Sequence, residues 1–257
     1  MHRLGFLIPQ RNVACEIEFP RFAPEGVSCH FQRLPRDGAT LTRESLVAMM
    51  ETVGEQSRAL AGIDIRVIMC ACTSGSFLDG TESAWTLGAN VTAATGIPGI
   101  TTTVAVVDAL RSLEARRIFM VTPYPEDITR REAEVFGAMD FEITSWRTFG
   151  CAQSEMIRQL TSADVERLVL SEHSAAKAAD AVFVSCTNLM TMDRILSLER
   201  KLGIPVISSN SATLWRALRE AGVPATDLGA GCLFEHPLLE GSAISREQAP
   251  AGREIID

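Results

Sequence analysis

The sequence predicts an α/β fold of two similar lobes, each with a parallel sheet, related by a pseudo-twofold axis. Short apolar runs alternate with longer amphipathic runs along the chain, which is typical of strands joined by helices in βαβ units. The chain also repeats itself. "RLGFLIP" ends at Pro9 and "RRIFMVTP" ends at Pro123, 114 positions later (123 − 9). "VIMCACTSGSF" contains Cys72 and "AVFVSCTNLMT" contains Cys186, with the same offset (186 − 72).

Each element follows from its pattern of apolar residues. Five runs predict strands clearly, at 4–8, 65–70, 118–121, 181–184 and 205–208. Weaker strand signals lie at 28–34, 99–102 and 142–148. Amphipathic patterns predict helices at about 43–60, 84–95, 104–113, 128–139, 162–178, 192–202 and 211–221. A third pair of similar segments, "GIPGITTTVAVVDAL" and "GIPVISSNSATLWRAL", follows the first two pairs in the same order along the chain.

The repeat divides the chain into two Rossmann-like lobes, related by duplication or by convergence on one plan. We expect lobe one to cover residues 1–112 and lobe two to cover residues 113–210. The segment from about 211 to 257 is expected to pack back on lobe one. Open α/β sheets bind ligands beyond the carboxyl ends of their strands. The active site is therefore expected in the cleft between the lobes.

Composition and charge narrow the possible functions. Hydrophobic residues make up 46% of the 257 residues, an ordinary globular balance, and the net charge of −8 argues against a nucleic-acid binder. No apolar run reaches the roughly 18 residues needed to span a membrane, and the N-terminus lacks signal-peptide organisation. We therefore expect a cytoplasmic protein with no nucleic-acid or membrane partner.

The seven cysteines are predicted to be free thiols. Their number is odd, and the C-x-C spacing of Cys70 and Cys72 is not that of a zinc-binding pair. Gly-rich phosphate-binding signatures are absent from the sequence, so neither a metal nor another cofactor is expected. Most of the cysteines should pack as small hydrophobes, and Cys15, Cys29 and Cys232 stand in no polar cluster.

Cys72 and Cys186 differ from the other cysteines because each follows a predicted strand and precedes hydrogen-bonding residues. These residues are Thr73, Ser74, Thr187 and Asn188. If the lobes face each other, the two thiols approach a substrate from opposite sides, as a two-base isomerisation requires. A helix N-terminus after each thiol would lower its pKa from about 8.5. The same N–H groups and side chains would hold a carboxylate.

The alternative to catalysis is packing, because a single cysteine at the end of a strand is more often inert. The match between two such cysteines favours catalysis. Two further residues have a structural and a functional interpretation. Tyr124, the only tyrosine, is a turn residue or faces the cleft. Asn12 caps a helix that starts near Val13, or points its amide at a ligand.

These motifs resemble the aspartate/glutamate racemase superfamily, and within it the group of maleate isomerases and arylmalonate decarboxylases. The resemblance covers nearly the whole chain and is carried by "VTPY" (121–124), "SC" (185–186) and "ACT" (71–73). It implies a two-lobed, cofactor-independent enzyme that acts on a small carboxylate or dicarboxylate as a homodimer or homotetramer. "VSCTNL" with "SSNSATLW" also resembles a branch linked to ectoine breakdown, where the substrate would be an amino-acid derivative.

The resemblance implies roles by position. Cys72 looks like the first maleate isomerase cysteine, the nucleophile on the double bond, and Cys186 looks like the second, the acid/base partner. Asn12 and Tyr124 look like ligands of a substrate carboxylate. Gln153 falls near an asparagine of the maleate isomerases, so we expect it to contact substrate as well.

The sequence also departs from both groups. "TSGSF" (73–77) is similar to the decarboxylases, whose Thr-Ser pair builds a dioxyanion pocket, but those enzymes have Gly at the position of Cys72. Gln10 and Arg11 stand where maleate isomerases tend to have two serines. Having both thiols favours an isomerase or racemase. The alternatives are a decarboxylase that uses Cys186 alone and a carboxylate-binding protein without turnover.

Overall fold

The computed structural model describes residues 1–38, 40–77, 80–226 and 228–239. Their strands form two four-stranded sheets in which every neighbouring pair is parallel. The first sheet has the order β2-β1-β3-β4 and contains β1 (His2–Pro9), β2 (Val27–Leu34), β3 (Val67–Cys70) and β4 (Gly99–Thr101). The second has the order β6-β5-β7-β8 and contains β5 (Arg117–Thr122), β6 (Glu142–Thr148), β7 (Ala181–Val184) and β8 (Val206–Ser208).

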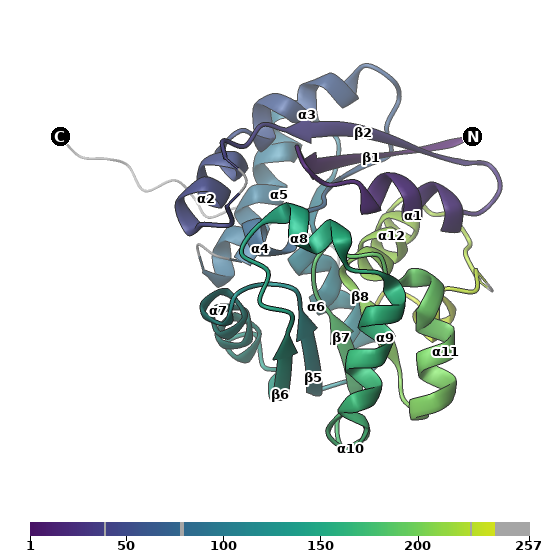
Figure 1. Ribbon diagram of the computed structural model, residues 1–257. Helices are drawn as coiled ribbons and strands as arrows, with labels where there is room; N and C mark the ends of the chain where they lie inside the picture. Colours follow the sequence, from purple (N-terminus) through teal and green to yellow (C-terminus); the bar gives the residue numbers. More distant parts are fainter. Residues whose placement is uncertain (39, 78–79, 227, 240–257) are drawn as a thin grey trace.

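The sequence repeat is also a structural repeat, because the two sheets have the same strand order. β1 and β5 occupy equivalent positions, and so do β3 and β7. All eight predicted strands are present, with small changes at their ends. Figure 1 shows the purple and blue lobe facing the teal and green lobe. The prediction of a two-lobed α/β fold with parallel sheets is confirmed.

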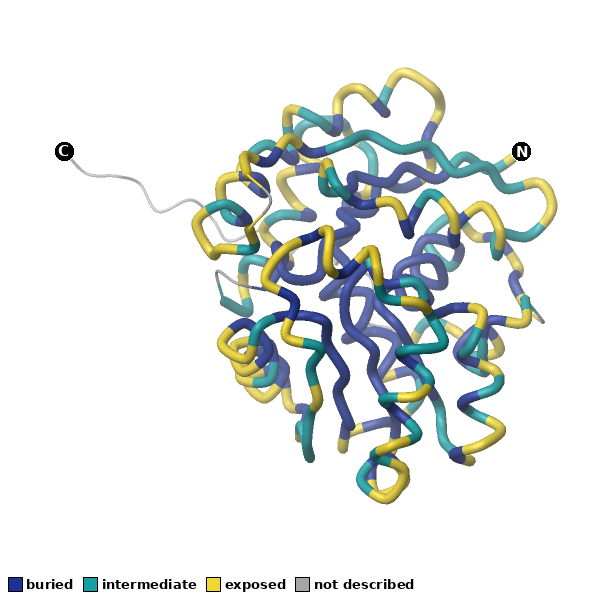
Figure 2. The backbone as a smooth tube through the Cα atoms, viewed as in Figure 1, coloured by how far each residue is buried: buried dark blue, intermediate teal, exposed yellow. Residues whose placement is uncertain are grey.

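Burial explains why some strands are clearer in the sequence than others. All residues of β3 and β7, at the centre of their sheets, are buried. A parallel strand covered on both faces reads as a continuous apolar run. The edge strands β2 and β6 are mostly half-buried, so their apolar signal is diluted. Figure 2 shows this gradient, with dark blue central strands and yellow outer turns.

Helices surround both sheets. In lobe one they are α1 (Ala14–Phe22), α2 (Arg43–Glu51), α3 (Val53–Ala61), α4 (Thr73–Phe77), α5 (Thr81–Thr95) and α6 (Thr102–Ser112). After β5 they are α7 (Glu126–Gly137), α8 (Ser154–Gln159), α9 (Ser162–Ser171), α10 (His173–Lys177), α11 (Met192–Leu202), α12 (Ser209–Glu220) and a 3-10 turn, η1 (Cys232–Glu235). Within the described ranges, no helix is long and apolar enough to cross a membrane.

Two predicted helices are each divided in two by a side-chain contact. The helix predicted at 43–60 stops at Thr52, whose hydroxyl donates to the carbonyl of Met49 at 2.7 Å. The helix predicted at 162–178 stops at Glu172, whose carboxylate is bound by the Nε and Nη2 of Arg147 at 2.8 Å each. The second contact comes from a distant strand, so a periodic pattern cannot reveal it.

The C-terminal helix α12 packs against α6 of lobe one. The hydroxyls of Thr102 and Thr213 are 2.8 Å apart, and Nε of Arg216 donates to Oδ2 of Asp108 at 2.9 Å. These contacts agree with the expectation that the chain returns to lobe one after residue 211. The end of that predicted segment, 240–257, lies outside the described residues. The lobe boundaries at 112 and 210 therefore remain a proposal.

Candidate active site

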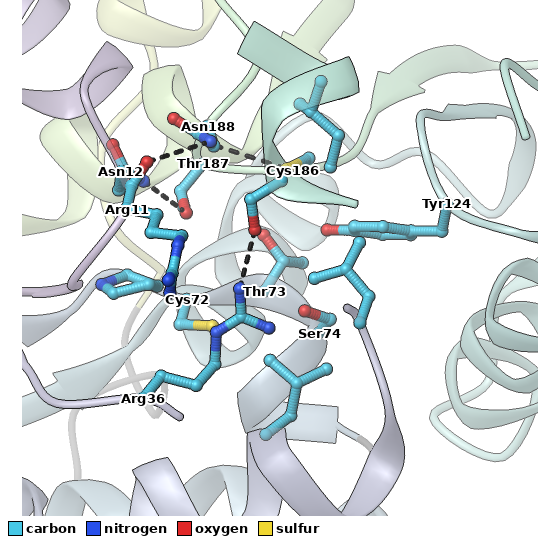
Figure 3. Close-up of a pocket in the computed structure, with 15 residues that line it drawn as sticks. Arg11, Asn12, Arg36, Cys72, Thr73, Ser74, Tyr124, Cys186, Thr187 and Asn188 are labelled. Carbon is cyan, nitrogen blue, oxygen red and sulfur yellow. Dashed lines mark hydrogen bonds between the residues drawn. The ribbon is translucent and has the colours of Figure 1, made fainter. Parts of the chain in front are cut away.

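A pocket lies at the carboxyl ends of strands from both sheets. The loops after β1 and β3 of lobe one and after β5 and β7 of lobe two line it. Its free volume is about 40 Å³. Figure 3 shows the side chains that surround it. The pocket brings together eight of the nine residues that the sequence singles out, namely Asn12, Cys72, Thr73, Ser74, Tyr124, Cys186, Thr187 and Asn188.

Cys72 follows β3 and directly precedes α4, as predicted, and only 3% of it is exposed. Burial raises the pKa of its thiol, because removal from water disfavours the thiolate. The N–H of Gly75, the hydroxyl of Ser74 and the guanidinium of Arg36 each act to lower that pKa. The expectation of a lowered pKa is therefore wrong, since desolvation outweighs these donors.

Gly75 is the glycine of "TSGSF", and its lack of a side chain makes room for the thiol. A Cβ at this position would lie 3.0 Å from Sγ of Cys72 and 2.6 Å from Sδ of Met50. Both distances are shorter than a carbon and a sulfur atom tolerate. The glycine therefore lets the first turn of α4 close against Cys72 and direct an N–H at its sulfur.

Cys186 follows β7 with φ at +102°, a backbone conformation that residues other than glycine rarely adopt. No helix starts after it, contrary to the expectation, because α11 begins only at Met192. Instead the N–H of Asn188 donates to Sγ of Cys186 at 3.3 Å. Burial raises the pKa of Cys186 to about 12, and the Asn188 N–H and the Tyr124 hydroxyl act against this rise. Backbone strain of this kind is concentrated at functional sites.

Behind Cys186, polar side chains connect it to a buried acid. The Tyr124 hydroxyl acts to lower the pKa of Cys186, and the side chain of Ser185 acts to lower the pKa of Tyr124. The hydroxyl of Ser185 donates to Oε1 of Glu132 at 2.6 Å. Burial raises the pKa of Glu132 to about 8, so this carboxyl is neutral at pH 7. The sequence places Tyr124 in this site but gives no sign of Glu132, which lies on the inner face of α7.

Several of the predicted carboxylate ligands hold the two lobes together. Nδ2 of Asn12 donates to Oγ1 of Thr187 at 3.1 Å, and Oδ1 of Asn12 accepts the N–H of Cys15 and so caps α1. Oγ1 of Thr187 donates to the carbonyl of Ala71 at 3.0 Å. Oγ1 of Thr73 donates to Oγ of Ser209 at 2.8 Å. These side chains therefore fix the relative position of the loops that carry the thiols.

Ser209 and Cys15 are two residues of this framework that the sequence does not indicate. Oγ of Ser209 also accepts the N–H of Cys186 at 3.0 Å, so one hydroxyl joins both thiol-bearing loops. The thiol of Cys15 donates to the carbonyl of Thr187 at 3.3 Å. The expectation that Cys15 has no polar partner is wrong, because α1 of lobe one packs directly against the second loop.

Arg36 is the charged residue of the pocket that the sequence does not reveal. It follows β2, is 5% exposed, and donates through Nη1 to the carbonyl of Thr40 at 3.0 Å and through Nη2 to Oγ of Ser154 at 2.7 Å. Figure 3 shows its guanidinium beside the sulfur of Cys72. The described part of the chain holds no cluster of three or more metal-ligating side chains.

The comparison with known protein families agrees with this architecture. The model of the arylmalonate decarboxylase family matches residues 4–234. The chain belongs to the arylmalonate decarboxylase family. This confirms the resemblance that the two cysteine motifs indicate.

Relatives within and around the arylmalonate decarboxylase family include enzymes of two activities. An arylmalonate decarboxylase from Bordetella bronchiseptica is 33% identical over 76% of this chain and 82% of its own length. A maleate isomerase from Nocardia farcinica is 26% identical over 95% of this chain and 98% of its own. A crystal structure of a Nocardia farcinica maleate cis-trans isomerase variant, with a covalently bound succinylcysteine intermediate, has a TM-score of 0.80, 26% identity and coverage of 91% and 98%.

Gln153 is the one predicted site residue of this family member that does not line the pocket. It is exposed and precedes α8, and its backbone pairs with Thr40. The next residue, Ser154, and Ile157 one turn later face the pocket instead. The prediction depended on an inexact positional match to an asparagine of the maleate isomerases.

Proposed function

We propose that this protein is a cofactor-independent isomerase or racemase of a small carboxylate, acting through Cys72 and Cys186. The observation that carries the proposal is that two thiols, one from each lobe, line a single pocket at the ends of equivalent strands. A reaction that inverts a carbon needs a proton acceptor on one side and a donor on the other. The relatives of this protein include maleate isomerases and an arylmalonate decarboxylase, which supports a small carboxylate or dicarboxylate as the substrate.

The electrostatics favour different roles for the two thiols. Cys72 has a positive charge nearby, from Arg36, which favours its thiolate. For Cys186, by contrast, a thiolate at Cys72 or a carboxylate at Glu132 would disfavour its own thiolate. We therefore assign Cys72 as the thiolate that attacks or accepts a proton. Cys186 is the thiol that donates, with Tyr124 holding its sulfur in place.

Two reactions fit these roles. In a racemisation, the Cys72 thiolate takes the α-proton, the electrons of the C–H bond pass into the carboxylate as an enediolate, and the Cys186 thiol returns a proton to the opposite face. In a cis–trans isomerisation, the Cys72 thiolate forms a C–S bond to one alkene carbon, and the π electrons pass to the other carbon and its carboxylate as an enediolate. Rotation about the resulting single bond follows, and elimination breaks the C–S bond to give the trans product.

The pocket also limits the size of the substrate. A water molecule needs roughly 10–15 Å³ by this measure of volume, so about 40 Å³ holds about three waters and favours a small acid over a large one. Pro9, Leu41, Leu46 and Ile157 supply its apolar lining. We assign the first carboxylate of the substrate to the Ser74 and Tyr124 hydroxyls, because the other predicted ligands already form hydrogen bonds between the lobes. An amino-acid derivative of the same size fits this description as well.

A second candidate function is decarboxylation of a disubstituted malonate. The family match and the 33% identical relative favour it. In that reaction the bond to one carboxylate breaks, CO₂ leaves, and the Cys186 thiol protonates the enediolate. Cys72 would have no part in the chemistry.

Single Cys→Ser variants distinguish these functions. A two-thiol isomerase predicts that Cys72→Ser and Cys186→Ser each lower turnover by roughly 10²–10⁴-fold, because each removes one proton-transfer group. Cys29→Ser is the matched control, since Cys29 lies on β2 outside the pocket. Full activity of Cys72→Ser would reject the two-thiol mechanism and favour the decarboxylase. The assay follows product formation and the entry of solvent deuterium at the α-carbon, and no entry across a broad panel of acids indicates binding without turnover.

The proposal also covers the cellular location, the partners and the oligomeric state of the enzyme. We expect a cytoplasmic homodimer or homotetramer without nucleic-acid or membrane partners. Sedimentation of the purified protein at several concentrations measures the number of subunits.

A further inference from the structure

Arg36 is a buried cation whose hydrogen-bonding capacity is only partly used. A guanidinium has five N–H donors, and Arg36 directs two of them at Thr40 and Ser154. Its Nε is buried without a hydrogen-bond partner. Within the described residues, no carboxylate forms an ion pair with it. Buried charges are otherwise paired in proteins, so this arginine lacks an anion.

Apart from the thiolate assigned to Cys72, the rest of the pocket supplies no anion to Arg36. No acidic residue is present among the described residues that line it. A second arginine, Arg11, also lines the pocket and is held by the carbonyl of Gly38 at 2.7 Å. Two guanidinium groups and no carboxylate make the side of the pocket near Cys72 positive. An anion that enters the pocket is attracted to this side.

The contacts of Arg36 hold its guanidinium in a fixed orientation. Thr40 belongs to the loop after β2, and Ser154 begins α8 in lobe two. The guanidinium of Arg36 is therefore held by hydrogen bonds to both lobes before any ligand binds. A planar guanidinium fixed in this way binds carboxylates with two parallel hydrogen bonds and discriminates strongly against neutral groups.

We propose that Arg36 is a specificity-determining residue that binds an anionic group of the substrate on the Cys72 side of the pocket. The inference rests on the proposed function, which places the other carboxylate at Ser74 and Tyr124. A neutral group in the same place would leave Nε of Arg36 buried and unpaired. Arg36 thus selects a substrate with a second carboxylate over the analogue that carries a methyl group there.

Ligand binding tests this without turnover. The protein used is the full chain with Cys72→Ser and Cys186→Ser, which lacks both thiols of the pocket, and the probes are succinate and butyrate, which differ by one carboxylate. Calorimetry is expected to give roughly tenfold or tighter binding of succinate. Arg36→Met should remove this preference and leave butyrate binding unchanged. Arg36→Lys, which keeps the charge without the fork, should retain part of it.

Two further variants separate binding from structure. Ser154→Ala removes one anchor but keeps the guanidinium, so it should retain a preference for succinate. Arg167→Met removes an exposed arginine of α9 and is the matched charge control. The proposal is overturned if the double Cys→Ser protein binds succinate no better than butyrate, or if Arg36→Met keeps the preference. Activity of the native chain with a monocarboxylate would leave the two-thiol mechanism intact, so the two proposals fail separately.

Discussion

At the scale of single residues, the acid behind Cys186 controls the charge near the thiol. Glu132 accepts the hydroxyl of Ser185 through Oε1, and its Oε2 is buried without a partner. A neutral carboxyl can be buried at this position, whereas a carboxylate there would repel a thiolate at Cys186 and raise the pKa of that cysteine. The pKa of about 8 keeps Glu132 neutral at pH 7. Glu132 is therefore protonated in the folded state at this pH.

Glu132→Gln should change how stability depends on pH. The folded pKa of about 8 lies above the ordinary value of 4.5, so the native state holds a proton that the unfolded state releases. The unfolding free energy of the native protein should therefore fall between pH 4.5 and 8, by up to about 1.4 kcal/mol per pH unit. The variant lacks this group, so its unfolding free energy should fall less.

Urea unfolding at pH 5, 7 and 9 measures the difference. Glu134→Gln, at an exposed acid of the same helix, is the control and should follow the native protein. Glu18, which is also buried, contributes equally to all three proteins and cancels in the comparison. Parallel pH curves for the native protein and Glu132→Gln would show that Glu132 is not protonated in the fold.

How far single site residues can be predicted depends on the repeat. Cys72 and Cys186 are recognisable because each has its counterpart in the other lobe, and Tyr124 because it follows the proline that matches Pro9. Arg36 has no counterpart, and "LPRDG" reads as a turn. Arg36 is hydrogen-bonded to Ser154 of the other lobe, 118 positions away, so its neighbours in the sequence do not reveal this contact.

At the scale of elements, α11 is capped by an acid from the other lobe. Its preceding residue, Thr191, makes no side-chain cap. Instead Oε1 of Glu18, on α1, accepts the N–H groups of Thr191 at 2.6 Å and Met192 at 2.7 Å. Oε2 accepts Nδ2 of Asn210 at 2.6 Å. The carboxyl thus satisfies donors from the starts of two helices.

Glu18→Ala should be strongly destabilising. The change leaves three buried N–H donors without acceptors, so we expect a loss of about 3 kcal/mol in the free energy of unfolding, measured by urea titration at pH 7. Glu25→Ala, at an exposed acid in the turn before β2, should change it by less than about 0.5 kcal/mol. A loss as small as that of the control would mean that water replaces the carboxyl.

Elements were predictable from the sequence where their own residues determine them. Buried strands such as β7 need no partner to be recognised, because their apolar runs are continuous. The short helix α8 was missed, since six residues carry no helical period. Only the starts of α4 and α1 were anticipated, from the residues that precede them, and Pro20 in the last turn of α1 obscures its pattern.

At the scale of the whole molecule, the lobes are joined by buried polar contacts. Asn12 contacts Thr187 beneath the pocket, and Thr73 contacts Ser209 beside it. On the α6–α12 side, Arg216 is fully buried and pairs with Asp108 of lobe one and, at 2.7 Å, with Glu220. Because opening one lobe alone would break these buried contacts, we expect the lobes to unfold together.

Arg216→Met tests this coupling. Arg216→Met breaks the buried ion pair by removing the cation beside the Asp108 carboxylate, which costs about 3–5 kcal/mol. If the lobes are coupled, hydrogen exchange of the native protein should give one opening free energy for β3 of lobe one and β7 of lobe two, since both exchange only by global unfolding. The variant should lower both values by the same amount, and Arg200→Met, at an exposed position of α11, should lower neither. If β3 alone lost protection in Arg216→Met, the lobes would be separate folding units, and the pocket between them would be held by the contacts of Asn12 and Thr73 rather than by a single cooperative core.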